Sequence, residues 1–247
     1  REGAHLVPLE GGGWAPLPQD WLESFGLQVL DLLVARGDRE TLPQYAAADV
    51  LDLCDDLGIE APKTMQRVRS LVEGFEGLPE YSVPEGVQAT LRPYQQKGLD
   101  WLSFLSDAGL GALLADDMGL GKTLQALCAF KGRSLVVAPT SVLHNWAEEI
   151  TRFRPNLKVC VFHGPRRQMD PEADVVLTSY TLLRSDIDLF CGETWPTVVL
   201  DEAQTIKNPT SQVSQAAYLL KADARFVLTG TPIENRLEEL WSLFHFL

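Results

Sequence analysis

The sequence lacks the spacing of cysteines and histidines that a zinc site requires. Its four cysteines (Cys54, Cys128, Cys160 and Cys191) form no C-x-x-C pair, and its four histidines are equally dispersed. We therefore expect reduced, buried thiols in an intracellular protein. No apolar run reaches the roughly 18 residues that a membrane-spanning helix needs, so we expect no association with a membrane.

The chain also lacks the marks of a natural beginning and end. It opens with REGAHLVPLE, without an initiator methionine or a signal-like apolar core. It stops within the apolar, helix-like run NRLEELWSLFHFL, where no capping signal follows. We therefore expect a fragment of a longer protein, cut by an experimenter.

Positive charge is scarce, and the deficit is uneven. The net charge is −13, of which residues 1–90 carry −10 (6 Lys and Arg against 16 Asp and Glu) and residues 91–247 carry −3 (15 against 18). This balance argues against a broad basic patch for nucleic acid. It does not exclude a narrow groove in which backbone amides and hydroxyls contact phosphates.

Residues 1–88 have the pattern of a small, mainly helical module. The Gly- and Pro-rich residues 1–20 favour a loop or a strand remnant, and Asp20 is placed to cap a helix that ends at Arg36. Further helices are predicted over 42–57 and 63–75. The acids of this module suit solvated helix faces, or the docking of a basic protein partner.

Residues 89–247 alternate short β-branched runs with helical patterns. The runs include GALLAD, LVVAP, KVCVFHG, DVVLTSY, TVVLDE and RFVLTG. Near-continuous apolar strands with helices between them predict an α/β domain, a parallel sheet with helices on both faces. Ligands bind such sheets at the carboxyl ends of the strands.

One loop in this region is rich in glycine. LLADDMGLGKTLQAL, residues 113–127, places a strand, a glycine turn and a helix in succession, which suits backbone N–H groups that bind phosphate. Lys122 can reach the β- and γ-phosphates, and the Thr123 hydroxyl can bind Mg²⁺. Asp116 stands where the full pattern has glycine. A left-handed glycine turn before a helix is the alternative, although it does not account for Lys122 and Thr123.

A second motif, VVLDEAQ at residues 198–204, places two carboxylates where a buried strand ends. A phosphate-loop enzyme needs one acid to hold Mg²⁺ and a second group to orient the attacking water. Asp201 suits the first role and Glu202 the second. An acidic strand end that simply faces solvent is the alternative.

Six motifs appear in an order that resembles the first motor lobe of SWI/SNF-type ATPases, within helicase superfamily two. They are LRPYQQKGLDWL, ADDMGLGKTLQAL, LVVAPTSVLHNW, VVLTSYTLL, VVLDEAQTIKN and LTGTPIENRLEELWSLFHFL. The resemblance covers residues 91–247 and none of residues 1–88. It implies a RecA-like ATP-binding lobe over 89–247, preceded by the helical module.

The resemblance implies that the nucleotide is ATP, bound with Mg²⁺. In this family the phosphate loop typically lacks the early glycine, as here. Gln95 would read the adenine edge with Arg92 nearby, since a side-chain amide donates and accepts at once. The expected phosphate-binding residues are Asp116, Asp117, Met118, Gly119, Leu120, Gly121, Lys122 and Thr123.

The resemblance also implies contacts with double-stranded DNA through its backbone. The expected residues are Pro139, Thr140, Ser141, Thr178, Ser179 and Tyr180. Helix N-caps would account for Thr140 or Ser141 equally well, and both roles can coexist. Thr229, Gly230 and Thr231 resemble the motif that couples the nucleotide to DNA. Gln204, where histidine is common in the family, can share that role. Trp146 and the pair His163-Gly164 match family positions that we interpret as structural.

The resembled motors bind ATP between two lobes, and the second lobe supplies an arginine finger worth about 10³–10⁵ in rate. No second lobe follows Leu247 in this sequence, so we expect weak ATP–Mg²⁺ binding, very slow hydrolysis and no translocation. The parent would be a DNA-stimulated ATPase that moves along duplex DNA without separating strands, in a bacterial cytoplasm or a eukaryotic nucleus.

Two other functions remain open from the sequence. The chain can be a protein-binding or regulatory scaffold, in which case Lys122→Ala would leave partner binding intact. It can also be a motor that acts on RNA or with RNA polymerase, in which case duplex DNA would not stimulate it.

Overall fold

The computed structural model describes residues 6–8, 14–16, 18–36, 46–62, 75–232 and 237–247. The chain divides into two compact units, Arg1–Glu76 and Gly77–Leu247. The division falls between residues 76 and 77, whereas the sequence suggested a boundary at 88. In the part that the structure describes, no helix is long and apolar enough to cross a membrane.

The first unit contains two short strands and two helices among its described residues. Strands β1 (Leu6–Pro8) and β2 (Trp14–Pro16) pair antiparallel, and helices α1 (Gln19–Arg36) and α2 (Ala47–Leu57) follow. Asp20 lies in the first turn of α1 and is not its cap. Helix α2 ends as predicted at Gly58, whose left-handed φ of 64° suits glycine. The start predicted for this helix at 42, and nearly all of the helix predicted over 63–75, lie outside the described residues.

The second unit is built on a six-stranded parallel sheet. The strands are β3 (Ala112–Leu114), β4 (Ser134–Ala138), β5 (Val159–Phe162), β6 (Val175–Ser179), β7 (Thr194–Asp201) and β8 (Lys221–Leu228). Their order is β3-β8-β7-β4-β6-β5, and every pair is parallel. This confirms the predicted α/β class.

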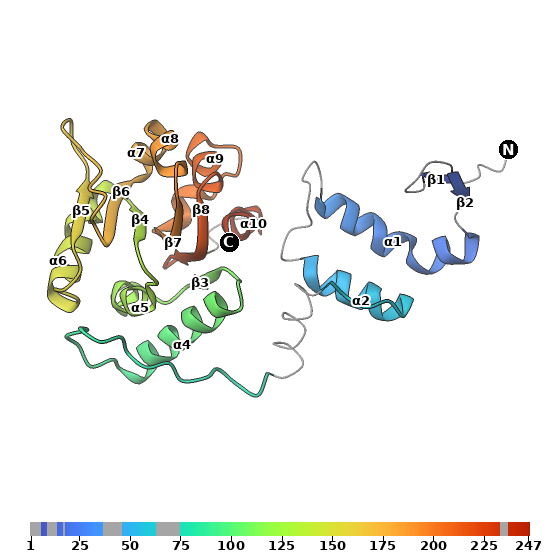
Figure 1. Ribbon diagram of the computed structural model, residues 1–247, viewed down its shortest axis with the longest axis horizontal. Coiled ribbons are helices and arrows are strands. Elements are labelled where there is room, and N and C mark those ends of the chain that lie inside the picture. The colour runs from blue at the N-terminus through green and yellow to red at the C-terminus, as the bar shows by residue number, and fades with distance from the viewer. Residues whose placement is uncertain (1–5, 9–13, 17, 37–45, 63–74, 233–236) are drawn as a thin grey trace. The chain divides into compact units, whose positions relative to one another are not determined.

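Helices cover both faces of this sheet (Figure 1). Helices α4 (Pro93–Asp107), α5 (Lys122–Ala129) and α6 (Leu143–Phe153) pack on one face. The other face carries α7 (Tyr180–Ser185), α8 (Ile187–Cys191), α9 (Gln212–Tyr218) and α10 (Leu237–Phe246). Two short 3-10 turns, η2 (Thr140–Val142) and η3 (Ala203–Ile206), follow β4 and β7.

The inner stretches of the central strands are apolar because both faces of the sheet are covered. Successive residues of a strand point to opposite faces. Val136 therefore belongs to the core under α4, α5 and α6, whereas Val137 belongs to the core under α7, α8 and α9. Both side chains are fully buried, so a run without polar residues is what this architecture requires.

The segment 77–88 belongs to the second unit because it is bonded to it. The backbone N–H of Tyr81 donates to Asp100 Oδ1 at 2.8 Å, and that of Gln88 donates to the Phe153 carbonyl at 2.7 Å. Val83 and Val87 pack against the core beneath α4. These contacts join residues distant in sequence, so the linker-like composition of the segment did not reveal them.

The strand register brings the functional loops together at one edge of the sheet. Leu114 and Asp201 are both paired with Leu228, so the ends of β3, β8 and β7 are level. Ala138 at the end of β4 is paired with Ser179 at the end of β6. The loops after all these strands therefore share the carboxyl edge.

Candidate functional site

The glycine loop lies between β3 and α5 and depends on two left-handed glycines. Gly119 has a φ of 82°, and Gly121, the N-cap of α5, has a φ of 75°. A Cβ on Gly121 would also lie 2.6 Å from Gln95 Nε2. Glycine is therefore required at 121 both by the backbone conformation and by a close neighbour.

Lys122 is the first residue of α5, and its side chain folds over the loop. Its Nζ donates to the carbonyl oxygens of Asp116 and Asp117, at 2.6 and 3.0 Å. The ammonium group is therefore held where phosphates would lie if the loop bound them. The first turn of α5 offers backbone N–H groups at the same place.

Asp116, the residue that departs from the full glycine pattern, anchors the loop. Its Oδ2 accepts a hydrogen bond from Gln125 Nε2 at 3.1 Å, and the Gln125 side chain is fully buried in α5. A glycine at position 116 would leave that amide without this acceptor. The acid therefore has a structural role in this form of the loop.

Gln95 also holds the glycine loop. Its Oε1 accepts from the backbone N–H of Arg92 at 2.9 Å, and its Nε2 donates to the Leu120 carbonyl at 3.2 Å. Neither Gln95 nor Arg92 lines the cavity described below. Their expected contact with adenine stays a prediction, and it would require Gln95 to exchange one of these bonds.

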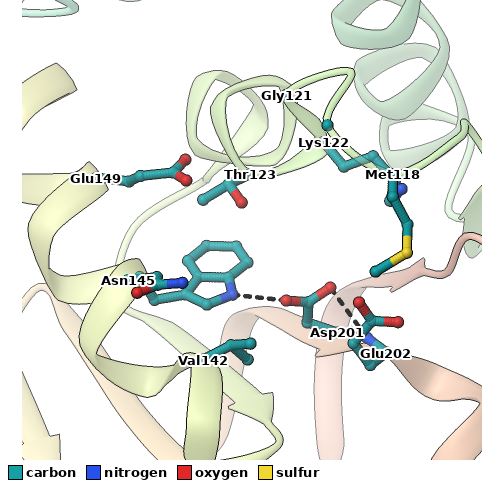
Figure 2. Close-up of a pocket in the computed structure, with 11 residues that line it drawn as sticks. Met118, Gly121, Lys122, Thr123, Val142, Asn145, Glu149, Asp201 and Glu202 are labelled. Atoms are coloured by element: carbon teal, nitrogen blue, oxygen red, sulfur yellow. Dashed lines mark hydrogen bonds between the residues drawn. The ribbon is translucent and has the colours of Figure 1, made fainter.

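Asp201 ends β7, and both of its carboxylate oxygens are engaged. The indole N–H of Trp146 donates to Oδ2 at 2.8 Å, and the backbone N–H of Glu202 donates to Oδ1 at 2.9 Å, as the dashed lines in Figure 2 mark. Burial raises the pKa of Asp201, and these two hydrogen bonds offset part of the rise. A bound cation would favour the charged form further.

Glu202 has the only positive φ, 48°, among the non-glycine residues that the structure describes. Such a conformation is strained and is typical of functional sites. Gln204 Nε2 donates to Glu202 Oε2 at 2.8 Å, and Gln204 Oε1 accepts from Thr229 Oγ1 at 3.0 Å. Thr229 Oγ1 in turn accepts from the Thr231 N–H at 3.1 Å. Gln204 thus joins the carboxylate motif to residues 229–231.

Gly230 lies against the glycine loop. A Cβ at this position would lie 3.2 Å from Met118 Cγ, which is a tight contact. The loop after β8 and the loop after β3 therefore touch, as expected for neighbouring strands.

These elements enclose a cavity of about 300 Å³, at the small end of the range for ligand pockets. In Figure 2, Lys122 and Thr123 face Asp201 and Glu202 across it. The lining residues are Met118, Gly119, Gly121, Lys122, Thr123, Val142, Asn145, Trp146, Glu149, Asp201 and Glu202.

Four lining residues, Val142, Asn145, Trp146 and Glu149, come from η2 and the first turns of α6 and were not predicted for this site. The spacing of Trp146 and Glu149 puts them on one face of a helix, but the sequence does not say what that face meets. Burial raises the pKa of Glu149, a rise that a hydrogen bond with Thr123 opposes.

The residues present suit ATP with Mg²⁺. Thr123 contributes a hydroxyl and Asp201 a carboxylate to the same cavity, and Mg²⁺ prefers one or two such oxygen ligands together with phosphate oxygens and water. Among the described residues, no cluster of three or more His, Cys, Asp or Glu side chains could hold a metal ion.

The two loops expected to contact DNA differ in exposure. Thr140 and Ser141 are exposed, and neither caps η2 or α6, so the capping alternative does not account for them. Thr178, Ser179 and Tyr180 are buried. Thr178 Oγ1 donates to the Phe162 carbonyl, and Ser179 caps α7 by accepting from Leu182 N. Contacts with DNA at this second loop would therefore need its backbone.

Comparison with known proteins agrees with this geometry. Residues 94–247 match the family model described as the SNF2-related domain. The "Putative ATP-dependent helicase/translocase YwqA" of Bacillus subtilis is 43% identical, over 91% of this chain and 26% of that protein. The TATA-binding protein-associated factor mot1 of Aspergillus fumigatus is 38% identical, over 69% of this chain and 10% of that protein.

A solved structure shows the same fold. The SWI2/SNF2 ATPase core of Sulfolobus solfataricus in complex with double-stranded DNA has a TM-score of 0.63 and 44% identity, over 68% of this chain and 38% of that one. The chain spans about a quarter of the length of YwqA. Since Gly77–Leu247 alone is less than 91% of the chain, the match to YwqA extends into the first unit.

Proposed function

Because this chain belongs to the SNF2-related family, we propose that it is the ATP-binding first lobe of a motor that moves along double-stranded DNA and remodels protein–DNA complexes without separating strands. The observation that carries this proposal is that Lys122 and Thr123 line the same cavity as Asp201 and Glu202. Hydrolysis of a nucleoside triphosphate requires a phosphate-binding loop that faces a pair of carboxylates.

Each residue has a role set by its chemistry. Lys122 and the N–H groups at the start of α5 would neutralise the phosphates. Thr123 and Asp201 would hold Mg²⁺, which would stabilise negative charge on the phosphoryl oxygens. Glu202, with one oxygen held by Gln204, is placed to orient the attacking water and accept its proton.

We assign the contact with DNA to the segment that follows β4. Thr140 and Ser141 are exposed hydroxyls after β4 and would contact phosphates without reading bases. This suits a motor that must move along any sequence. The solved relative from Sulfolobus solfataricus is an ATPase core in complex with double-stranded DNA. A second lobe would complete the ATP site with an arginine, and the first unit would bind a protein partner.

The test is the binding of a fluorescent ATP analogue to this chain, compared with Lys122→Ala. We expect Lys122→Ala to abolish binding, because the loop then lacks its ammonium group. Glu202→Gln should bind as the wild type does, since the amide keeps the size of the side chain and an oxygen for Gln204. In the full-length protein, Glu202→Gln should lower the rate of ATP hydrolysis stimulated by duplex DNA by about 10²–10⁴.

Two outcomes would contradict the proposal. Equal binding by the wild type and Lys122→Ala would show that the cavity does not hold the nucleotide, and a scaffold role would then be favoured. Stimulation of the full-length protein by RNA but not by duplex DNA would assign the motor to a different track.

A further inference from the structure

Asp201 is held by two buried aromatic side chains that come from different helices. The Trp146 indole on α6 is 2% exposed and donates to Asp201 Oδ2 at 2.8 Å. The Tyr180 ring, at the start of α7, is 4% exposed, and its hydroxyl donates to the backbone carbonyl of Asp201 at 2.8 Å. One bond fixes the carboxylate and the other fixes the main chain of the same residue.

Each aromatic residue comes shortly after the end of a strand at the same edge of the sheet. Helix α6 begins directly after residues 139–142, and Tyr180 directly follows Ser179. Strand β4 lies between β6 and β7, and its end pairs with Ser179. The ends of β4 and β6 are thus neighbours, and the segment after each is joined to Asp201 by one aromatic side chain.

We propose that Trp146 and Tyr180 are positioning residues, which hold Asp201 in the orientation that binds Mg²⁺ and link that orientation to the two loops expected to face DNA. This inference rests on the proposed function, because it concerns the cation of the same nucleotide site. It gives both residues a part in the ATP site. From the sequence, Trp146 was interpreted as structural and Tyr180 as a contact to DNA.

The hydrogen bonds from Trp146 and Tyr180 restrain different parts of Asp201. A carboxylate at the end of a strand can rotate about its side-chain torsions, and the indole N–H at Oδ2 with the Glu202 N–H at Oδ1 removes that freedom. Tyr180 holds the peptide that leads into Glu202, whose φ of 48° must be maintained by its surroundings. Residues that orient a metal ligand in this way typically change metal affinity 10- to 100-fold when they are replaced.

The chain offers matched controls for both residues. Trp195 is a fully buried tryptophan whose indole N–H bonds to the Phe190 carbonyl, away from the cavity. The Tyr218 hydroxyl pairs with Ser242 Oγ at 2.6 Å. Replacing either by phenylalanine removes the same polar group as the test variants do.

The experiment measures the affinity of the chain for a fluorescent ATP analogue, once with Mg²⁺ and once with EDTA. We expect Trp146→Phe to weaken binding about ten-fold in Mg²⁺, and Tyr180→Phe to weaken it by a smaller factor. Neither should change the affinity measured in EDTA. Trp195→Phe and Tyr218→Phe should match the wild type under both conditions.

The remaining outcomes are distinguishable. If the wild type binds no nucleotide, the proposed function fails. If it binds but Mg²⁺ adds nothing, or if both test variants keep the full Mg²⁺ effect, the positioning role is wrong and the function stands. Equal losses in Mg²⁺ and EDTA would assign both residues a purely structural role.

A second variant, Trp146→His, is used if Trp146→Phe does not fold. The histidine ring supplies an N–H donor, so we expect this variant to keep part of the Mg²⁺ effect on binding. A complete loss of the Mg²⁺ effect in Trp146→His would overturn the inference.

Discussion

Gly119 and Gly121 share a left-handed conformation but differ in their surroundings. A Cβ on Gly119 would meet no atom within 4 Å, whereas one on Gly121 would lie 2.6 Å from Gln95 Nε2. The pair therefore separates the cost of the backbone conformation from the cost of displacing Gln95. That amide bonds to the Leu120 carbonyl, so its displacement would also loosen the loop.

We predict that Gly119→Ala destabilises the second unit by about 1–2 kcal/mol, the cost of a left-handed residue with a side chain. Gly121→Ala should cost more, and both substitutions should weaken binding of the ATP analogue, because both glycines line the cavity. Urea unfolding and nucleotide titration of the two variants measure both effects. Identical losses for the two would show that Gln95 does not support the loop.

Glu149 allows a prediction about pH. Burial raises its pKa, so the folded chain holds this proton more tightly than the unfolded chain does. The stability that comes from protonated Glu149 is present below the carboxyl's ordinary pKa and is lost as the pH rises through the folded value. Glu149→Gln is neutral at every pH and avoids this loss.

Without nucleotide or metal, the free energy of unfolding of Glu149→Gln should therefore exceed that of the wild type. The difference should grow as the pH rises from the ordinary pKa of the carboxyl group to its raised pKa in the folded chain. Urea unfolding at several pH values measures the difference. Glu85→Gln removes the same charge from an exposed side chain of the second unit and serves as the control. A difference that does not change with pH would contradict the assigned burial effect.

Helix α6 connects two functions at the scale of the element. The η2 turn before it carries Thr140 and Ser141, and its own first turns carry Trp146 and Glu149. The helical spacing predicted the element, but the sequence did not show which atoms it meets. The side chains that bind Asp201 come from residues more than twenty positions away, a distance at which sequence pattern carries no information.

The elements themselves were more predictable than their contacts. Apolar strands without alternation correctly predicted a parallel sheet with two covered faces, because few architectures bury both faces of every strand. The sequence did not show that Thr178, Ser179 and Tyr180 would be buried. Hydroxyl-bearing residues at a strand end suit a phosphate contact, a helix cap or an internal bond equally well, and only packing decides between them.

We predict that the double variant Thr140→Ala/Ser141→Ala weakens binding of duplex DNA without changing its dependence on salt. Each hydroxyl-to-phosphate bond contributes about 1.5–3 kcal/mol, so a loss of ten-fold or more is expected. The salt slope should stay constant because neutral hydroxyls release no counterions. Binding at several salt concentrations tests this, with Thr151→Ala, on the exposed part of α6, as the control. Unchanged DNA affinity would exclude this loop from the interface.

At the scale of the whole molecule, every hydrogen bond described for the site joins residues of Gly77–Leu247. The boundary matters because the segment 77–88 is bonded to α4 and α6 through Tyr81 and Gln88. A chain that begins at Gly77 should keep these bonds, whereas a chain that begins at 89 loses them together with the packing of Val83 and Val87.

We therefore predict that a 77–247 chain binds the ATP analogue as tightly as the 247-residue chain does, and that an 89–247 chain is less stable by several kcal/mol. Each lost hydrogen bond contributes about 0.5–1.5 kcal/mol, and each of the two partly buried valines contributes a part of the about 1.5–3 kcal/mol that full burial gives. Urea unfolding and nucleotide titration of the two shortened chains measure these effects. Equal stability of the 77–247 and 89–247 chains would place the domain boundary at residue 88. Weaker binding by the 77–247 chain would instead show that the first unit supports the ATP site, and its acidic helices would then have a part in the motor itself.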